Sequence, residues 1–208
     1  MLRFDGLTKA FGGRPILDGA TARLAPGAYA LQGENGCGKS TLLAMLAGAI
    51  APDAGDVWID GHSLSADPVV ARMRLAYAPD ESPVYPFITG SDFLDFVASA
   101  RQCANVDADL VTELGLAPHL PKRFSAMSLG TQKKVLLCAA WIGAAPVKLL
   151  DEPSNGLDLG ARDVIARRIA RHAVDAVILF ASHDAAFVAA SGAKVLPFDE
   201  LVSSSTES

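Results

Sequence analysis

A surplus of positive charge is missing from this sequence. Its 208 residues include 18 Lys and Arg against 23 Asp and Glu, which gives a formal net charge of −5. Proteins that hold nucleic acid present clustered basic side chains to the phosphates. The composition therefore argues against a nucleic-acid partner, and we expect none.

Cysteine is scarce and shows no pairing pattern. The three residues Cys37, Cys103 and Cys138 are odd in number and form no C-x-x-C motif. This argues against a disulfide framework and against a zinc site. The cysteine usage fits a reducing compartment such as the cytoplasm.

Long hydrophobic runs are also missing. The longest, LLAMLAGAIA and VLLCAAWIGAAPV, fall short of the roughly 18 residues that span a bilayer, and the N-terminal MLRFDGLTKAF has no apolar segment of signal-peptide length. We predict that the chain does not itself cross a membrane. Hydrophobic residues nonetheless make up 50% of the sequence, which allows a surface that docks on an apolar partner.

What the sequence does contain is an alternation of short apolar strands and helical segments, which predicts an α/β fold in a single domain over residues 1–208. The N-terminal residues read as an antiparallel β subdomain punctuated by Gly and Pro. A small helical subdomain is predicted over about residues 82–140, with a first helix opened by a Ser or Asp cap near SDFLDF. The polar residues from about 202 to 208 are predicted to form a disordered tail.

The segment GENGCGKST at residues 33–41 fits G-x-x-x-x-G-K-[ST] and lies between a predicted strand and a predicted helix. Its glycines let backbone N–H groups surround phosphates, Lys39 reaches the outer phosphates, and the Ser40 hydroxyl can ligate Mg²⁺. We therefore predict a nucleotide-binding P-loop, against the alternative of a glycine-rich turn that binds nothing. Its predicted binding residues are Gly33, Glu34, Asn35, Gly36, Cys37, Gly38, Lys39, Ser40 and Thr41.

The segment LLDEP ends an apolar strand in two adjacent carboxylates. Side chains alternate along a strand, so Asp151 and Glu152 should face different ways at the C-terminal edge, where open α/β sheets bind ligands. Asp151 then suits Mg²⁺ or its water, and Glu152 suits the general base that polarises the attacking water. The alternative is an acidic pair that caps a helix near Pro153.

Two further features are weaker by themselves. His183 ends the apolar strand AVILFASH, where a lone histidine is more often a hydrogen-bonded structural residue than a catalytic one. MSLGTQ at residues 127–132 opens an apolar helix with a hydroxyl residue and a glycine, and such helix starts attract anions. The purpose of this second, half-formed anion site is not evident from the motif alone.

The order of these motifs resembles the nucleotide-binding subunit of ATP-binding-cassette (ABC) transporters, of the single-cassette bacterial exporter type. P-loop, MSLGTQ, LLDEP, SNGLD and SHD follow one another in this order, and the likeness covers almost the whole chain. The resemblance implies a P-loop NTPase core, with ATP and Mg²⁺ as cofactors and ATP hydrolysis coupled to transport. It makes Glu152 and His183 the catalytic residues, His183 as the sensor of the γ-phosphate.

The resemblance also assigns the remaining binding positions. Phe11 takes the place of the aromatic that stacks on adenine, although a hairpin aromatic that simply packs in the core is the alternative. The signature positions fall on Ser128, Gly130 and Gln132, and the D-loop aspartate is Asp158. The metal positions are Ser40, Asp80 and Asp151.

The same resemblance explains the half-site and names partners. In the family, the signature helix closes over ATP held by a second subunit, which implies a head-to-tail dimer, in the simplest case of two identical chains, with two ATPs between them. It also implies an integral membrane permease as partner and a peripheral location on the cytoplasmic face of the inner or plasma membrane. The stretch from Ser82 to Phe96, with Tyr85, Phe87 and Phe93, is expected to receive the permease unless these aromatics only pack the subdomain.

The sequence departs from the family at two places. Leu129 and Thr131 differ from the common signature LSGGQ, at positions that tolerate change. Asp80 stands where the family usually has a glutamine that links Mg²⁺ to the helical subdomain, which puts the details of that link in doubt. The alternative functions are a soluble ABC-type ATPase acting on ribosomes or DNA, against which the acidic single cassette argues, and a small-molecule phosphotransferase.

Overall fold

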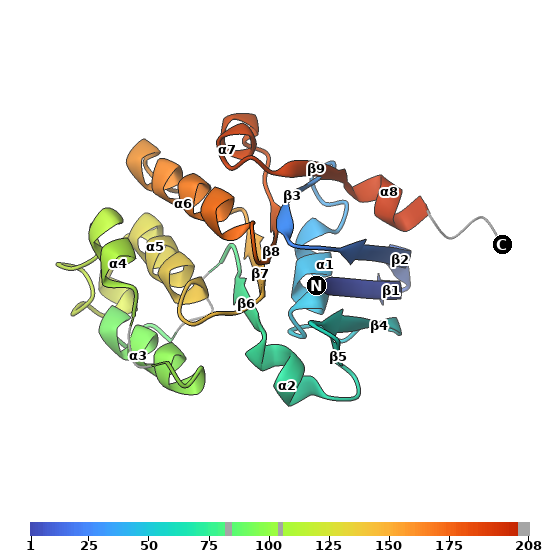
Figure 1. Cartoon of the computed structure of the whole chain (residues 1–208), viewed down its shortest axis with the longest axis horizontal. Helices are drawn as coiled ribbons and strands as arrows, with labels where there is room; N and C mark the ends of the chain where they lie inside the picture. Colours follow the sequence, from blue (N-terminus) through green and yellow to red (C-terminus); the bar gives the residue numbers. More distant parts are fainter. Residues whose placement is uncertain (82–84, 104–105, 204–208) are drawn as a thin grey trace.

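The computed structural model describes residues 1–81, 85–103 and 106–203, and it confirms the predicted α/β fold with two sheets (Figure 1). The antiparallel sheet has the order β2 (Arg14–Leu24), β1 (Leu2–Phe11), β4 (Ala54–Ile59) and β5 (His62–Ser63). The parallel sheet has the order β6 (Leu75–Ala78), β7 (Val147–Asp151), β8 (Val177–Ala181), β3 (Gly27–Gln32) and β9 (Lys194–Pro197).

Helices α1 to α7 fall into three groups around the sheets (Figure 1). Helix α1 (Lys39–Leu46) lies between the two sheets, and α2 (Pro68–Met73) leads from β5 to β6. On the other face of the parallel sheet lie α5 (Leu129–Ala140), α6 (Leu159–His172) and α7 (Ala185–Ala190). The end farthest from the antiparallel sheet is formed by α3 (Gly90–Ala100) and α4 (Ala108–Glu113).

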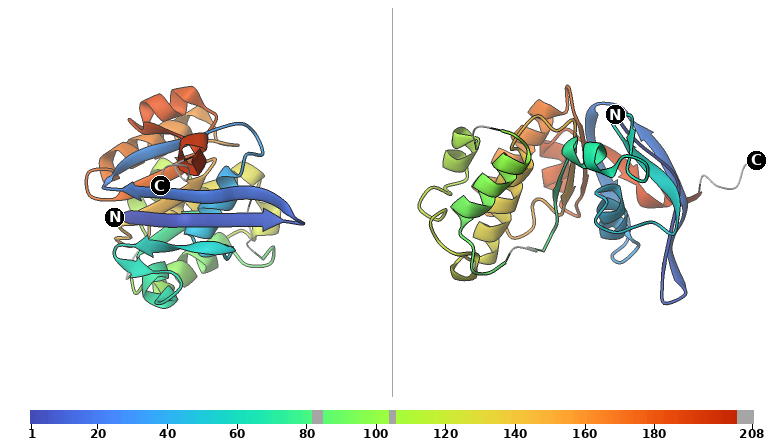
Figure 2. Two further views of the ribbon diagram at one scale, coloured as in Figure 1. Left: turned by 90° about the vertical axis from the view of Figure 1, so that its right-hand side faces the viewer. Right: turned by 90° about the horizontal axis from the view of Figure 1, so that it is seen from below.

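Side chains of the parallel strands alternate between two hydrophobic cores. Leu149 of β7 packs in the core shared with α1 and the antiparallel sheet, whereas its neighbour Leu150 packs in the core shared with α5 and α6. A strand covered on both faces has to be apolar on both, which explains the continuous apolar run VILFA of β8 and the adjacent leucines of β7. The hairpin of β1 and β2 extends beyond the rest of the body (Figure 2).

Two details differ from the sequence prediction. The first helix of the helical subdomain is capped by Thr89, whose hydroxyl accepts from the Asp92 backbone N–H while the Asp92 carboxylate accepts from the Thr89 N–H. This reciprocal capping box is more complete than the Ser or Asp cap that we expected. At the other end, α8 (Phe198–Ser203) continues into the start of the predicted tail, and residues 204–208 lie outside the described residues.

The parallel sheet brings four loops to one edge. All of its strands run the same way, so the loops that follow β3, β6, β7 and β8 leave from the same side. In register, Leu31 of β3 and Asp151 of β7 both pair with Ala181 of β8. The P-loop, Asp151, Glu152 and His183 therefore leave the sheet at nearly the same level, the edge at which open α/β sheets bind ligands.

Candidate functional site

The loop over residues 33–38 reaches α1 through a conformation that only glycine adopts without strain. Gly38 has φ 116° at the N-terminus of α1. An added Cβ there would lie 2.8 Å from Cγ2 of Ile16 and 3.1 Å from Cζ of Phe198, so both the backbone and the space require glycine. Lys39 follows with its side chain 6% exposed, and its ammonium donates to the carbonyls of Gly33 (2.9 Å) and Glu34 (2.8 Å). The loop thus surrounds the ammonium group of Lys39.

Asp151 faces the P-loop because alternation along β7 turns it to the side of α1. The Ser40 hydroxyl donates to Oδ1 of Asp151 at 3.1 Å. Burial raises the pKa of Asp151, and the bond from Ser40 works against that rise. The predicted metal positions Ser40 and Asp151 therefore meet in the structure, one from α1 and one from β7.

Glu152 and His183 meet at the next position of the same edge. Nε2 of His183 lies 3.4 Å from Oε1 of Glu152. The backbone of Glu152 has φ 46°, a left-handed conformation that costs a non-glycine residue about 1–3 kcal/mol and is common at functional sites. Burial raises the pKa of Glu152, and the nearby His183 partly opposes this rise. A raised pKa is the direction expected of a general-base candidate.

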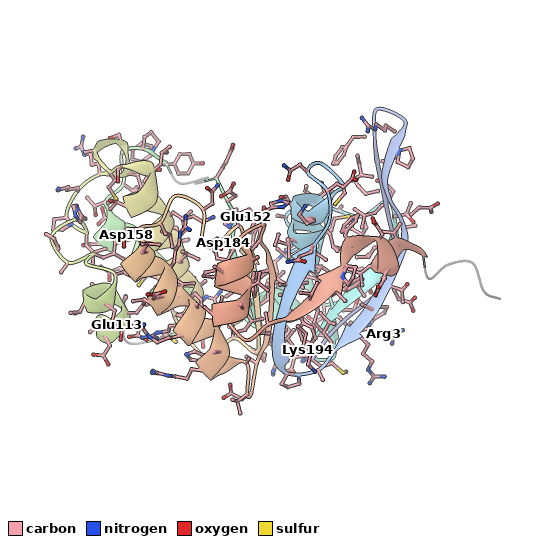
Figure 3. All side chains as sticks on the ribbon, turned by 90° about the horizontal axis from the view of Figure 1, so that it is seen from above. Arg3, Glu113, Glu152, Asp158, Asp184 and Lys194 are labelled. Atoms are coloured by element: carbon pink, nitrogen blue, oxygen red, sulfur yellow. The ribbon has the colours of Figure 1, made fainter. Side chains whose placement is uncertain are left out.

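These groups line one cleft of about 260 Å³, which is bordered by the P-loop, the end of β7 and the end of β8. Figure 3 shows Glu152 in the middle of the molecule, with Asp184 close to it and Glu113 at the far end of the helical subdomain. The residues that line the cleft are Ile16, Asn35, Gly36, Gly38, Lys39, Ser40, Thr41, Glu152 and His183. The glycine-rich loop, a lysine and a general-base candidate thus share one space.

The signature segment lies outside this cleft. Ser128 caps α5 by accepting from the Thr131 N–H at 3.2 Å, and both Ser128 and the next residue, Leu129 (83% exposed), face solvent. Gly130 packs tightly, because an added Cβ would lie 2.6 Å from the carbonyl oxygen of Gly156. The amide nitrogen of Gln132 donates inward to the carbonyl of Phe124 at 2.8 Å, so the Gln132 side chain braces its own chain.

Asp158 and Asp80 each pair with a lysine of α5. Asp158 caps α6 through the Ala161 N–H and accepts from Lys134 at 2.6 Å. Oδ1 of Asp80 lies 3.1 Å from the ammonium of Lys133, which is 5% exposed. In this structure the Asp80 carboxylate is therefore compensated by a lysine from the signature helix.

The predicted aromatic positions have two kinds of surroundings. Phe11 is 49% exposed at the tip of the hairpin, with the Lys9 ammonium 5.4 Å from its ring centroid, so it is not a core residue. Tyr85 (68% exposed) stacks on Phe87 (64% exposed), whereas Phe93 packs edge-on against the buried Phe124. The start of the predicted docking stretch, residues 82–84, lies outside the described residues.

Two residues of this region escaped the sequence prediction. Lys133 follows the signature segment but has the sequence context of an ordinary helix lysine, and no motif assigns Phe198 to the site. Both act through contacts with residues distant in the chain, and no local pattern records such contacts. The fold and the cleft together define a P-loop nucleotide-binding protein.

Comparison with known proteins specifies the family. The ABC transporter family model matches residues 17–155. Over 174 residues the chain is 33% identical to the Nod factor export ATP-binding protein I of Paraburkholderia xenovorans, an alignment that covers 81% of this chain and 57% of that protein. Over 193 residues it is 32% identical to an Fe(3+) ions import ATP-binding protein of Rhodococcus jostii, with 88% and 55% covered. The chain belongs to the ABC transporter family.

Solved structures agree with this assignment. The structure of an ATP-binding subunit of an ABC transporter superimposes with a TM-score of 0.83 at 27% identity, over 90% of this chain and 81% of that one. A dimeric post-hydrolysis state of an ATP-binding cassette bound to ADP and Pi superimposes equally well, with a TM-score of 0.83, but at 16% identity it shows the fold alone. The chain spans a little over half the length of the two relatives named above (57% and 55%).

Proposed function

We propose that this chain is the ATP-binding and ATP-hydrolysing subunit of an ABC transporter and energises a separate membrane permease. The observation that carries the proposal is the meeting of Lys39, Ser40, Glu152 and His183 in one cleft at the edge of the parallel sheet. Such a constellation is suited to phosphoryl transfer to water, in which positioning and charge stabilisation supply most of the catalysis. Family membership supports the same activity.

The residues of the cleft divide the chemistry among them. Backbone N–H groups of the P-loop and the Lys39 ammonium bind the phosphates, and Lys39 exchanges its bonds to Gly33 and Glu34 for phosphate oxygens. Glu152 accepts a proton from water as the water oxygen bonds to the γ-phosphorus. The bond between that phosphorus and the β–γ bridging oxygen breaks, and ADP and phosphate leave. His183 orients Glu152 and the γ-phosphate from the end of β8.

The same edge fits a magnesium ion. Mg²⁺ favours oxygen ligands and is held by few protein groups plus phosphates and water, and the paired oxygens of Ser40 and Asp151 are of that kind. Within the described residues, His, Cys, Asp and Glu do not gather in threes as for an all-protein metal site, which agrees with a metal that arrives with the nucleotide. When bound, Mg²⁺ would neutralise charge on the phosphates, and we propose Asp80 as an outer ligand of the ion.

The exposed signature segment supports a two-chain arrangement. Ser128 and Gly130 belong to a surface separate from the cleft, and Leu129, which lies between them in the chain, is 83% exposed. Leu159, the first residue of α6, is also largely exposed (77%). We propose that a second copy docks head to tail, so that Ser128 and Gly130 close over ATP in the partner's cleft. Each ATP then contributes to the interface, and association depends on ATP.

The permease contact is assigned to the helical subdomain. Tyr85, Phe87 and Phe96, which are 64–70% exposed, provide an aromatic surface for a helix of the partner. Across the described ranges, which leave out residues 82–84, 104–105 and 204–208, no helix combines the length and the apolar character that a bilayer crossing demands. From the aromatic surface and the family membership, we propose that the chain lies at the cytoplasmic face of the membrane, held there by its permease.

Replacing Glu152 by Gln tests the hydrolytic role. We expect Glu152→Gln to keep ATP binding and to lower the hydrolysis rate by roughly 10²–10⁴, the usual effect of a lost general base. The variant should accumulate as an ATP-bound dimer in size-exclusion chromatography with light scattering. Asp184→Asn, next to the cleft but outside the proposed chemistry, serves as a control for local disturbance.

The outcomes separate the candidate functions. Hydrolysis at the wild-type rate, or a monomer at saturating ATP, contradicts the roles given to Glu152 and to the signature segment. Copurification with a multi-span membrane protein supports the transporter assignment, whereas recovery on ribosomes or DNA supports a soluble ABC-type ATPase instead.

A further inference from the structure

Lys133 connects three segments of the site through a single buried ammonium group. Its side chain is 5% exposed. It donates to Oδ1 of Asp80 at 3.1 Å, to the carbonyl of Pro79 at 3.1 Å and to the carbonyl of Asp151 at 2.7 Å, and the Asp80 carbonyl lies at 3.4 Å. Pro79 and Asp80 follow β6, Asp151 ends β7, and Lys133 itself belongs to the first turns of α5.

Such a contact fixes geometry, because a buried cation tolerates little displacement from its acceptors. Moving a charge out of water costs several kcal/mol unless good hydrogen bonds and an opposite charge compensate it. Here one carboxylate and two short carbonyl contacts supply that compensation. Asn155, after β7, adds a second and longer contact to Asp80, with Nδ2 3.4 Å from the same Oδ1.

Lys133 connects the chain's own cleft to its signature segment, the two parts of which the proposed ATP sites are built. Its acceptors belong to the edge of the sheet that carries Asp151 and the P-loop. Its own helix begins one turn earlier at Ser128 and Gly130, which are proposed to serve the partner's ATP. A displacement of α5 against the sheet would therefore move Ser128 and Gly130 relative to the chain's own cleft.

We infer that Lys133 is a positioning residue, which sets the signature end of α5 at the distance and angle from the cleft that a two-chain ATP site requires. Asp80, at the position where the family's usual glutamine is absent, supplies its counter-charge. The inference rests on the proposed function, because only a site shared between two chains makes the placement of Ser128 relative to the chain's own cleft matter. The inference does not require Lys133 to contact ATP.

The test separates binding in the chain's own cleft from assembly of the two-chain site. In a Glu152→Gln background, ATP affinity is measured at low protein concentration, and dimerisation is measured at saturating Mg-ATP. We expect Lys133→Met to change the ATP affinity less than about threefold and to weaken ATP-driven dimerisation at least about tenfold, as for a coupled residue outside the binding contacts. Lys133→Arg, which keeps the charge, should recover part of the dimerisation.

Lys148→Met is the matched control. Lys148 is also a buried lysine (3% exposed) and belongs to β7 itself, but its ammonium donates to the carbonyl of Ala145, just before the start of β7 and away from Asp151. We expect this variant to leave both ATP affinity and dimerisation as in the parent. Circular dichroism at the assay temperature verifies that each variant is folded.

A second measurement without nucleotide checks the contact itself. Unfolding by denaturant is compared for Lys133→Met, Asp80→Asn and the double variant, and the two single losses should add to more than the loss of the double variant. Additive losses of stability overturn the inference. A fall of ATP affinity and of dimerisation by the same factor also overturns it, because Lys133 would then have only a structural role.

The Glu152→Gln parent tests the premises. If this parent binds ATP but stays monomeric, the site is not shared between two chains, and if it binds no ATP, the proposed function is wrong.

Discussion

Two buried lysines of this chain have opposite surroundings. Lys133 faces the carboxylate of Asp80, whereas Lys148 is buried next to another cation, Arg101, and has one carbonyl acceptor. Burial, with a further contribution from Arg101, lowers the pKa of Lys148 from its ordinary 10.5 to about 8. Asp175 opposes this shift only in part. The fold thus retains a lysine whose charge is incompletely compensated, and this lowers the stability of the fold.

Replacing Lys148 by Met is expected to stabilise the protein at neutral pH. At pH below about 8 both folded and unfolded states are protonated at Lys148, so the folded state carries the full cost of the lowered pKa, about 3 kcal/mol. Between about pH 8 and pH 10.5 only the unfolded state still binds the proton, and stability rises with pH. Lys148→Met removes both the cost and this rise.

Denaturant unfolding at about pH 7 and about pH 9.5 measures the effect. We expect a gain of about 1–3 kcal/mol at the lower pH and a smaller one at the higher pH. Lys194→Met, at an exposed position on β9 (Figure 3), is the control and should change stability by less than about 0.5 kcal/mol. An unchanged or lower stability for Lys148→Met at the lower pH would refute this account.

Among single residues, the sequence predicts those whose role depends on local pattern. The P-loop, Asp151 and Glu152 could be named because a strand, a turn and a helix follow one another there. Lys133 and Asp80 could not be paired in advance, because they are far apart in the chain and meet only after β6, β7 and α5 have packed. The roles of these residues in catalysis remain predictions.

At the scale of elements, α8 packs against the P-loop through its first residue. Phe198, 3% exposed, packs against both Gly33 and Gly38, because added Cβ atoms there would lie 3.0 and 3.1 Å from its side chain. Just before it, Pro197 of β9 pairs with Gln32 of β3, which immediately precedes the P-loop. β9 and α8, the last strand and helix of the described residues, therefore pack against the P-loop and the strand that precedes it.

Phe198→Ala is expected to weaken ATP binding as well as stability. The lost ring leaves a cavity that costs about 3–5 kcal/mol and frees the P-loop to move. Phe187→Ala is the matched control, since Phe187 is also buried (4% exposed) but packs on Phe180 in the other core. Isothermal titration with ATP, at a temperature where both variants are folded, should show a weaker affinity for Phe198→Ala alone. An equal change in both would show that only global stability is involved.

The elements show where sequence patterns are informative. The strands of the parallel sheet and helices α5 and α6 were predictable, because the apolar residues and the helix caps that mark them lie close together in the sequence. Helices α2 and α8 have six residues each, and a helix of that length owes its stability to tertiary packing, as with Phe198, more than to its own sequence. Strand β5 has two residues and is too short to show an alternation of apolar and polar side chains.

At the scale of the whole molecule, the head-to-tail proposal predicts complementation between two inactive variants. Glu152→Gln keeps its signature segment intact, and Ser128→Arg keeps its own cleft intact. In a mixed dimer, one site combines both intact parts and the other combines both defects. Equal mixing should therefore restore about a quarter of the wild-type ATPase rate if pairing is random and the sites act independently.

The complementation is measured as ATPase activity at constant total protein over a series of mixing ratios. Activity should peak at the equal mixture and vanish at either pure variant. A flat line at the activity of the pure variants would mean that each chain completes its own site. Mixing Glu152→Gln with Lys39→Ala is the negative control, because both defects lie in the cleft and no intact site can form.

The strand that leads into the P-loop has both of its neighbours late in the chain. β3 ends at Gln32, yet it pairs with β8, which begins at Val177, and with β9, which begins at Lys194. Such distant pairings are slow to form, because the intervening chain has to be ordered first. On the ribosome, where the N-terminal part emerges first, β3 is enclosed only after β8 and β9 have been synthesised. The capacity to bind ATP therefore depends on strands that are made long after the P-loop itself.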